Sequence, residues 1–140
     1  MSEPAYAAFS ALDPFFDIVM RGLAGRVDGD HYFDAIAPQA VFEFRYRFPS
    51  YPTKVVGREA LMALYSGYGD GISLHGAGAL VVNVSRSAGV VILEYEVQGA
   101  AVRSGKVYEN RFISVVTIAD RKIVGWRDYM DSLAAMSALT

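Results

Sequence analysis

The spacing of hydrophobic residues changes along the chain, from a helical period in the first third to alternation in the second half. Phe15, Val19 and Leu23 form one apolar stripe at helical spacing, directly after Asp13-Pro14, a pair typical of a helix start. From residue 73 onward apolar and polar positions alternate, as in strands with two different faces. Helices followed by consecutive strands predict an α+β fold.

Three further elements are predicted in the first half of the chain. Asp30 is expected to cap a short helix that carries Tyr32, Phe33 and Ile36 and ends at Pro38. Residues 40–48 alternate as a strand with an aromatic face, formed by Phe42, Phe44, Tyr46 and Phe48. A short strand at 54–56 precedes a third helix that begins at Gly57, and the glycines at 67, 69 and 71 end this helix as a flexible connector.

The second half is predicted to form four β-rich runs: residues 73–85, residues 88–99, and two strands within 105–131. Their short connections, including turns at 86–89 and at Asp120-Arg121, predict antiparallel neighbours. The whole chain, residues 1–140, is expected to be one domain, with residues 1–12 as a loose arm or the first turn of a helix.

The candidate chemistry centres on Asp128, which the alternation places beside Trp126 on a largely apolar strand face. Tyr95, Tyr108 and Asn110 fall on the same side of neighbouring strands. One carboxylate, two phenols and an amide could bind and polarise a carbonyl, with Asp128 moving a proton. Burial would raise the pKa of Asp128, whereas hydrogen bonds from Asn110 or a tyrosine would lower it, and the sequence leaves this balance open.

The same residues also have a purely structural interpretation. An aspartate near a strand end can hold a turn or pair with an arginine, and inward tyrosines are usually core residues with satisfied hydroxyls. The charged residues on the opposite strand faces are expected to form cross-strand ion pairs; they are Glu94, Glu96, Glu109, Arg111 and Arg127. A one-residue bulge would instead turn Glu94 or Glu96 inward, beside Asp128.

Composition narrows the classes of partner. Of the 140 residues 53% are hydrophobic and 13% aromatic, enough for a lined cavity or a subunit interface as well as a core. The formal net charge is −2 and the basic residues form no cluster, so nucleic acid is not expected as a partner. With no cysteine and only His31 and His75, neither a metal site nor a cofactor is expected.

No membrane association is expected from the sequence. Eighteen apolar residues never run together, and the first residues carry an acidic side chain and a proline where a secretory signal would be basic. The expectation is a soluble cytoplasmic protein.

The order of elements resembles the nuclear transport factor 2-like superfamily, together with VGREAL at 56–61 and GKVYENRF…RKIVGWRDYMD between residues 105 and 131. Within it, the sequence is most similar to the SnoaL-like group, which includes polyketide cyclases and is related to limonene epoxide hydrolase and ketosteroid isomerase. The resemblance runs from Asp13 onward. It implies a cone-shaped, strongly curved, mostly antiparallel sheet wrapped around N-terminal helices, an apolar internal pocket, and a homodimer built on the outer sheet face.

The resemblance carries over only in part. The Trp-Arg-Asp-Tyr-x-Asp motif at 126–131 is similar to that of limonene epoxide hydrolase, whose catalytic carboxylate corresponds to Asp128. The positions of that enzyme's other catalytic residues hold Tyr95, Val97, Phe42 and Phe44 here. The two catalytic aspartates of ketosteroid isomerase fall near Phe44 and Ser114. Neither specific activity is therefore predicted.

Two hypotheses follow. In the first, the protein is a cofactor-free enzyme, an isomerase, cyclase or dehydratase-like catalyst that acts on a small apolar carbonyl compound with Asp128 as acid and base. The expected ligand contacts are Tyr95, Tyr108, Asn110, Trp126, Phe42 and Phe44. In the second, the same aromatic residues hold a hydrophobic ligand without chemistry, or the domain serves dimerisation.

Overall fold

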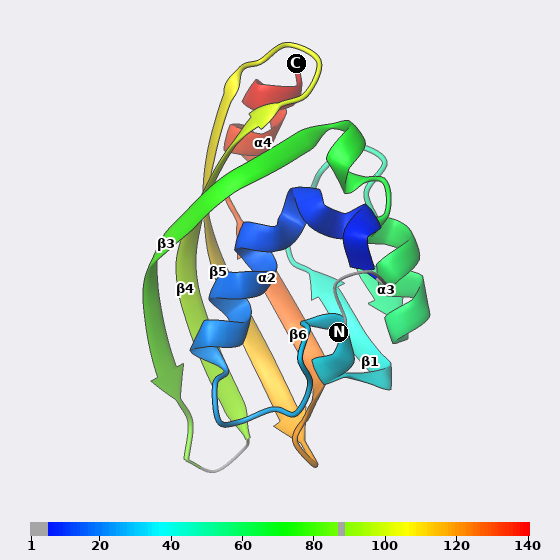
Figure 1. The fold of residues 1–140 in the computed structure, drawn as a ribbon, viewed down its shortest axis with the longest axis vertical. Coiled ribbons are helices and arrows are strands. Elements are labelled where there is room, and N and C mark those ends of the chain that lie inside the picture. The colour runs from blue at the N-terminus through cyan, green and yellow to red at the C-terminus, as the bar shows by residue number, and fades with distance from the viewer. Residues whose placement is uncertain (1–5, 87–88) are drawn as a thin grey trace.

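The computed structural model describes residues 6–86 and 89–140 and shows a six-stranded, curved sheet with helices on its concave side (Figure 1). The strands are β1 (Ile36–Phe44), β2 (Lys54–Val56), β3 (Ile72–Val84), β4 (Val90–Ala101), β5 (Val107–Ala119) and β6 (Lys122–Met130). The α-helices are α2 (Asp13–Gly22), α3 (Arg58–Tyr65) and α4 (Ser132–Leu139), and the 3-10 helices are η1 (Ala7–Leu12), η2 (Phe33–Ala35) and η3 (Tyr68–Asp70). The predicted α+β class is confirmed.

The sheet order is β2-β1-β6-β5-β4-β3. Every neighbouring pair is antiparallel except β1 and β6, which are parallel. This one parallel pair brings the early strand β1 beside the last strand, because residues 45–121 pass through β2 to β5 before β6 returns to it. Consequently Phe42 is paired with Trp126, and Phe44 with Asp128.

The predicted hairpin between β5 and β6 is confirmed. Asp120 and Arg121 form its two-residue turn with φ of 51° and 61°, both in the left-handed region. Two such residues match the right-handed twist of antiparallel strands, and aspartate tolerates this conformation better than most residues.

Two irregularities bend β3 over the helices. The register with β4 shifts between Leu74 and Gly76 and again between Gly78 and Val81. On β4, a side chain at Gly99 would collide with the backbone carbonyl of Ser73, so the two strands can approach closely there only with glycine. Bulges of this kind increase local twist and bend a strand, which gives the sheet its curvature.

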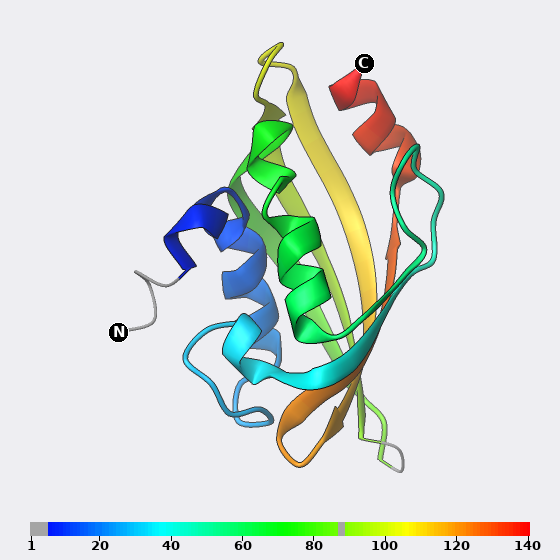
Figure 2. The same ribbon diagram turned by 90° about the vertical axis from the view of Figure 1, so that its right-hand side faces the viewer.

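The concave side of the sheet is covered by α2 and α3, as Figure 2 shows. The stripe of α2 is buried as predicted, including Phe15, Val19 and the following Leu23. Leu12 rather than Asp13 occupies the N-cap position, so Asp13 lies in the first helical turn and supplies no side-chain cap. The buried aromatic core therefore lies between these helices and the inner faces of β1, β4, β5 and β6.

Several predicted boundaries are wrong. The helix expected behind Asp30 is only the three-residue η2, and Ile36 and Pro38 belong to β1. Pro38 is tolerated in a strand because the β1–β6 register is broken between Ile36 and Val41, where no regular ladder bond is required from it. The strand expected at 40–48 ends at Phe44, and residues 45–53 form a loop.

Helical structure is found near both ends of the described chain. Residues 1–5 of the expected arm and residues 87–88 of the expected turn lie outside the described part of the chain, but residues 7–12 form η1, with Leu12 in the core. No element is predicted for residues 132–139, which form α4. Its start is capped by Asp131, whose side chain accepts hydrogen bonds from the backbone N–H groups of Leu133 and Ala134.

The outer sheet face carries the expected charged residues. Glu96 and Arg111 are cross-strand partners and form an ion pair with an N–O distance of 3.8 Å. The β4–β5 register runs without a shift from Val90 to Ala100, so neither Glu94 nor Glu96 turns inward. The alternative of a carboxylate pair with Asp128 is therefore wrong.

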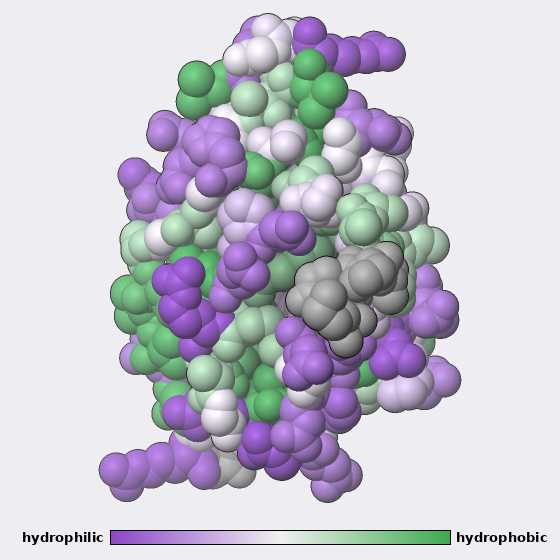
Figure 3. Space-filling model, viewed as in Figure 1, coloured by the Kyte–Doolittle hydropathy of each residue, from purple (hydrophilic) through white to green (hydrophobic). Residues whose placement is uncertain are grey.

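Exposed apolar residues also gather along the edge strand β3, on the face shown in Figure 3. Val81, Val82 and Val84 are all exposed there. Within the described residues no helix is long and apolar enough to cross a membrane.

Candidate active site

An apolar cavity of about 240 Å³ lies on the concave side of the sheet, between β5, β6, the loop 45–53, α3, η3 and α4. Most of its lining is aromatic or aliphatic, and Asp128 is the single charged residue among the described residues that line it. Five tyrosines also line it: Tyr46, Tyr51, Tyr65, Tyr68 and Tyr108. The volume lies slightly below the 300 Å³ or so at which ligand pockets typically begin, which suits a small ligand.

Asp128 is held in the wall of this cavity by two neighbours on the sheet. Its side chain is only 5% exposed. Its Oδ1 accepts hydrogen bonds from the Ser114 hydroxyl (2.7 Å) and from the Trp126 indole N–H (3.0 Å). Ser114 lies directly opposite Asp128 in the β5–β6 register, whereas Trp126 lies two residues earlier on the same face. The described residues place no hydrogen bond on Oδ2, which leaves this oxygen for a ligand.

The sequence leaves open whether burial or hydrogen bonding has the larger effect on the pKa of Asp128, and in the structure burial has the larger effect. Desolvation raises the pKa of Asp128 to about 6, and the hydrogen bonds from Ser114 and Trp126 lower it by less. The carboxyl group therefore changes its protonation close to neutral pH, where a group can act as both base and acid.

Tyr95 reaches Asp128 only through Ser114. The Tyr95 and Ser114 hydroxyl oxygens are 2.8 Å apart. Because the Ser114 hydroxyl donates its single proton to Asp128, the Tyr95 hydroxyl must donate to the Ser114 oxygen. Ser114 was not among the predicted site residues, although it shares the strand face of Tyr108 and Asn110, and this alternation was the available signal.

Tyr108 and Asn110 form a separate polar group nearer the start of β5. The Asn110 amide nitrogen donates to the Tyr108 hydroxyl (2.8 Å) and to the Met130 sulfur (3.4 Å). The Asn110 amide oxygen accepts from the backbone N–H groups of Arg111 and Asp131. Tyr108 lines the cavity, but Asn110 lies behind it, and neither forms a hydrogen bond with Asp128.

The remaining predicted contacts lie behind the cavity lining. Trp126, Tyr95, Phe42 and Phe44 are each at most 2% exposed and belong to the aromatic core. The Trp126 ring packs against Phe42 at a centroid distance of 6.1 Å. They shape and support the wall rather than form its surface, apart from the hydrogen bond that Trp126 gives to Asp128.

Four lining tyrosines were not predicted as ligand contacts: Tyr46, Tyr51, Tyr65 and Tyr68. Burial raises the pKa of each of them, so their hydroxyls stay protonated and can donate hydrogen bonds at neutral pH. Tyr46 was expected on the aromatic face of a strand, but it lies with Tyr51 in the loop 45–53, where strand alternation does not apply.

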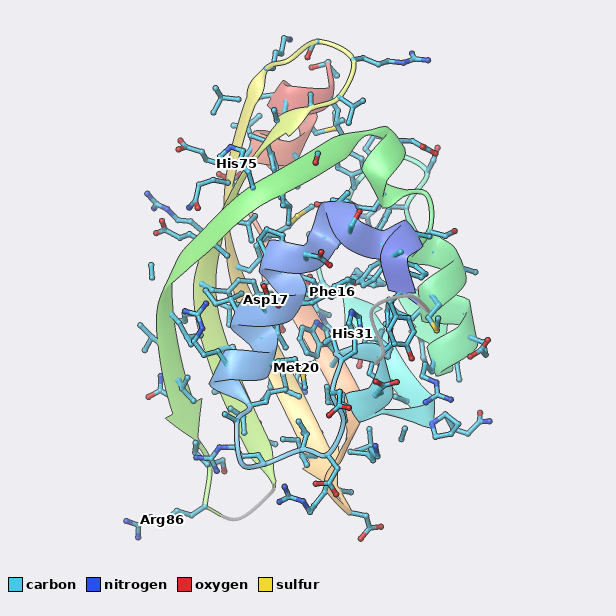
Figure 4. The ribbon with its side chains drawn as sticks, viewed as in Figure 1. Phe16, Asp17, Met20, His31, His75 and Arg86 are labelled. Atoms are coloured by element: carbon cyan, nitrogen blue, oxygen red, sulfur yellow. The ribbon has the colours of Figure 1, made fainter. Side chains whose placement is uncertain are left out.

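The two histidines are far apart, as Figure 4 shows. His31 lies beside Phe16 on the helical side of the molecule, where its Nδ1 accepts a hydrogen bond from the backbone of Phe33. His75 lies on β3. In the described part of the chain, no group of three or more potential ligands could hold a metal ion.

Comparison with known proteins agrees with this architecture. The sequence pattern of the SnoaL-like domain matches residues 15–126, so the chain belongs to the SnoaL-like family. The uncharacterized protein YesE of Bacillus subtilis is 32% identical over 99 residues, which cover 71% of this chain and 67% of YesE.

Two solved structures share the fold. A provisionally named isomerase from Bacillus subtilis aligns with a TM-score of 0.75 and 27% identity, over 94% of this chain and 91% of its own. An NTF2-like protein from Burkholderia xenovorans aligns with a TM-score of 0.65 and 17% identity, over 95% of each chain. The expected SnoaL-like family, and the fold that it shares with an NTF2-like protein, are therefore confirmed.

Proposed function

We propose that this protein is a cofactor-free isomerase or cyclase that acts on a small apolar carbonyl compound, with Asp128 as the acid and base. One observation carries the proposal: a buried carboxyl group with a pKa of about 6 lines an apolar cavity and keeps one oxygen, Oδ2, without a protein partner among the described residues. Burying such a group costs folding free energy, and perturbed carboxyl groups in clefts are candidates for proton transfer.

In this mechanism, ionised Asp128 removes a proton from the carbon next to the substrate carbonyl. The C–H electron pair moves into the carbonyl group and forms an enolate, whose oxygen accepts a hydrogen bond from a protonated tyrosine of the lining. Where the substrate carries a carbon–carbon double bond next to that carbon, the enolate is a dienolate, and Asp128 returns the proton to its far carbon, so the double bond moves next to the carbonyl and an isomer forms. Alternatively, the enolate carbon attacks a second carbonyl carbon of the same molecule, and Asp128 protonates the new alkoxide, which gives a ring.

The surrounding residues fit these steps. Ser114 and Trp126 both bind Oδ1, so they orient the carboxyl group and leave Oδ2 toward the cavity. The aromatic lining excludes water, which strengthens hydrogen bonds to the developing enolate. The Bacillus subtilis structure at 27% identity carries the name of an isomerase, which is consistent with this type of chemistry.

The test is exchange of enolisable hydrogens in D₂O, followed by proton NMR, for a panel of small apolar ketones such as 1-tetralone. The wild type is expected to accelerate exchange beside the carbonyl, with kcat/KM rising as pH increases through about 6 because the base form is required. Asp128→Asn should lose this acceleration while still binding the ketone. Ketones that bind in the cavity but exchange no faster than in buffer would refute the proposal.

A ligand-binding module without chemistry is the second candidate. It is supported by the apolar residues Phe42, Phe44 and Val97 at positions where limonene epoxide hydrolase has catalytic polar groups. In that case Asp128→Asn would leave both ligand affinity and the absence of exchange unchanged.

A further inference from the structure

Asn110 has an orientation that the backbone fixes. Its amide oxygen accepts from the N–H of Arg111 at 2.8 Å and from the N–H of Asp131 at 3.1 Å. Both partners can only donate, so the oxygen must face them and the amide NH₂ must face the other way. The NH₂ group then donates to the Tyr108 hydroxyl at 2.8 Å.

The fixed amide determines what Tyr108 can do. Because its oxygen accepts from Asn110, the Tyr108 hydroxyl must direct its own proton elsewhere. Among the described residues, the Asn110 amide is the one hydrogen-bond partner of the Tyr108 hydroxyl, so no protein group accepts the Tyr108 proton. The hydroxyl proton of Tyr108 is therefore left for a ligand.

Because Tyr108 is buried, its hydroxyl proton can point only into the cavity. Tyr108 is 1% exposed and Asn110 is 3% exposed, so bulk water does not supply an acceptor. Tyr108 and Tyr68 both line the cavity, and its lining near Tyr108 is otherwise apolar, with Leu74, Val97 and Leu139. Donors in such a chain also polarise one another, which strengthens the terminal one.

The Tyr108 hydroxyl lies at a different position along the sheet from Asp128, the proposed reaction centre. Tyr108 lies six residues before Ser114 on β5, about 20 Å of extended strand, although the bend of the sheet and the tyrosine side chain shorten the gap. Ser114 is the residue that holds Asp128. A ligand that contacts both Asp128 and Tyr108 would therefore extend along the cavity.

We infer that Tyr108 is a specificity-determining residue that donates a hydrogen bond to a second oxygen of the substrate, remote from the carbonyl at Asp128. The inference rests on the proposed function, which places the reacting carbonyl at the Asp128 end of the cavity. It names the substrate class more closely: an apolar, elongated or bicyclic ketone with a further acceptor oxygen, such as an ether or a second carbonyl, at its far end.

Two probes of nearly equal shape test this inference: 6-methoxy-1-tetralone, which has the remote oxygen, and 6-ethyl-1-tetralone, which has a methylene in its place. Their dissociation constants would be measured by isothermal titration calorimetry. The wild type is expected to prefer the methoxy ketone about fivefold, the contribution of one ordinary hydrogen bond. In Tyr108→Phe the preference should disappear, chiefly because the methoxy ketone binds more weakly.

Two further variants sharpen the result. Asn110→Asp places an acceptor where the NH₂ donor was, so Tyr108 should turn its proton away from the cavity and the preference should be lost although the hydroxyl remains. Tyr129→Phe changes an outward-facing tyrosine of β6 and is the matched control, expected to keep the preference. Circular dichroism confirms the fold of each variant.

The inference and the proposed function can fail separately. If exchange beside the carbonyl depends on Asp128 but Tyr108→Phe keeps the fivefold preference, the inference is wrong and the proposed function stands. If no exchange occurs but Tyr108→Phe abolishes the preference, the oxygen subsite stands and the catalytic role of Asp128 fails. A wild type that binds neither probe up to its solubility limit, or binds both equally, overturns the inference.

Discussion

At the scale of single residues, Asp128 combines two effects that oppose one another. Burial disfavours its charge, whereas the Ser114 hydroxyl and the Trp126 indole favour it, and burial has the larger effect. A charged form that is costly in the folded state is typical of groups kept for function rather than stability.

The stability of the protein should therefore depend on pH through this residue. The folded pKa of about 6 exceeds the ordinary value of 3.8, so the folded state binds the proton more tightly. The stabilisation is complete below pH 3.8 and is lost as the pH rises through 6, an effect of about 3 kcal/mol for two pKa units.

Asp128→Asn stays neutral at every pH and should thus be more stable than the wild type at pH 8, by up to about 3 kcal/mol, with no advantage below pH 4. Urea denaturation of both proteins across this range measures the difference. A difference that does not change with pH would show that Asp128 titrates normally in the folded state.

Tyr32 carries a second residue-scale prediction. Its side chain is fully buried and stacks on Phe16, and its hydroxyl has no hydrogen-bond partner among the described residues. Removing an unpaired buried hydroxyl relieves its desolvation cost, so Tyr32→Phe should raise the free energy of unfolding by about 1 kcal/mol.

Chemical denaturation tests the Tyr32 prediction, with Tyr129→Phe on the outer sheet face as the control for loss of a hydroxyl outside the core. A destabilised Tyr32→Phe protein would contradict it and would mean that the hydroxyl makes a bond in solution.

At the scale of elements, α4 links the end of the chain to the cavity. Ala135 and Leu139 of this helix line the cavity, and the backbone N–H of Asp131 binds Asn110. The helix is only eight residues long, too short to be stable by itself, so its cap and its packing must hold it.

Asp131→Ala removes the cap and is expected to cost about 1 kcal/mol. Because α4 is a terminal element, the loss should appear mainly as faster amide hydrogen exchange in residues 133–139 and weaker ligand binding, with little change elsewhere. Asp131→Asn keeps a capping oxygen and serves as the control. Equal exchange in the Ala and Asn variants would be inconsistent with a capping role.

The elements also show where sequence patterns succeed. The β5–β6 hairpin and the α2 stripe follow from local alternation and local helical spacing, and both are as predicted. The helix expected after Asp30 is not formed because Ile36 begins β1 and pairs with Ile123 of β6, which outweighs its local preference. α4 went unnoticed because it is apolar on all sides and thus shows no amphipathic period.

At the scale of the whole molecule, we propose a homodimer through the outer sheet face. Ile113 and Tyr129 are direct cross-strand neighbours there and are 43% and 38% exposed, which gives an apolar centre among charged residues. Such an arrangement is common at the middle of protein interfaces.

Ile113→Asp would place a charge at that centre and should convert the dimer to a monomer, as measured by sedimentation equilibrium. Val82→Asp, which changes an exposed valine on the edge strand β3, should leave the mass unchanged. A wild type that sediments as a monomer would end this proposal without affecting the cavity.

The sequence by itself determined the α+β class, the two faces of each strand, and the inward position of Asp128 with Trp126, Tyr108 and Asn110. These depend on periodicity, which is a local property of the backbone. Only the tertiary structure decided which of these residues meet. Ser114 lies fourteen residues before Asp128 and binds it because the hairpin register places them opposite, whereas Asn110 turns to the start of α4 instead. The cavity itself is formed by strands, helices and a loop that are distant in sequence, so its shape depends on how they pack and not on a local pattern.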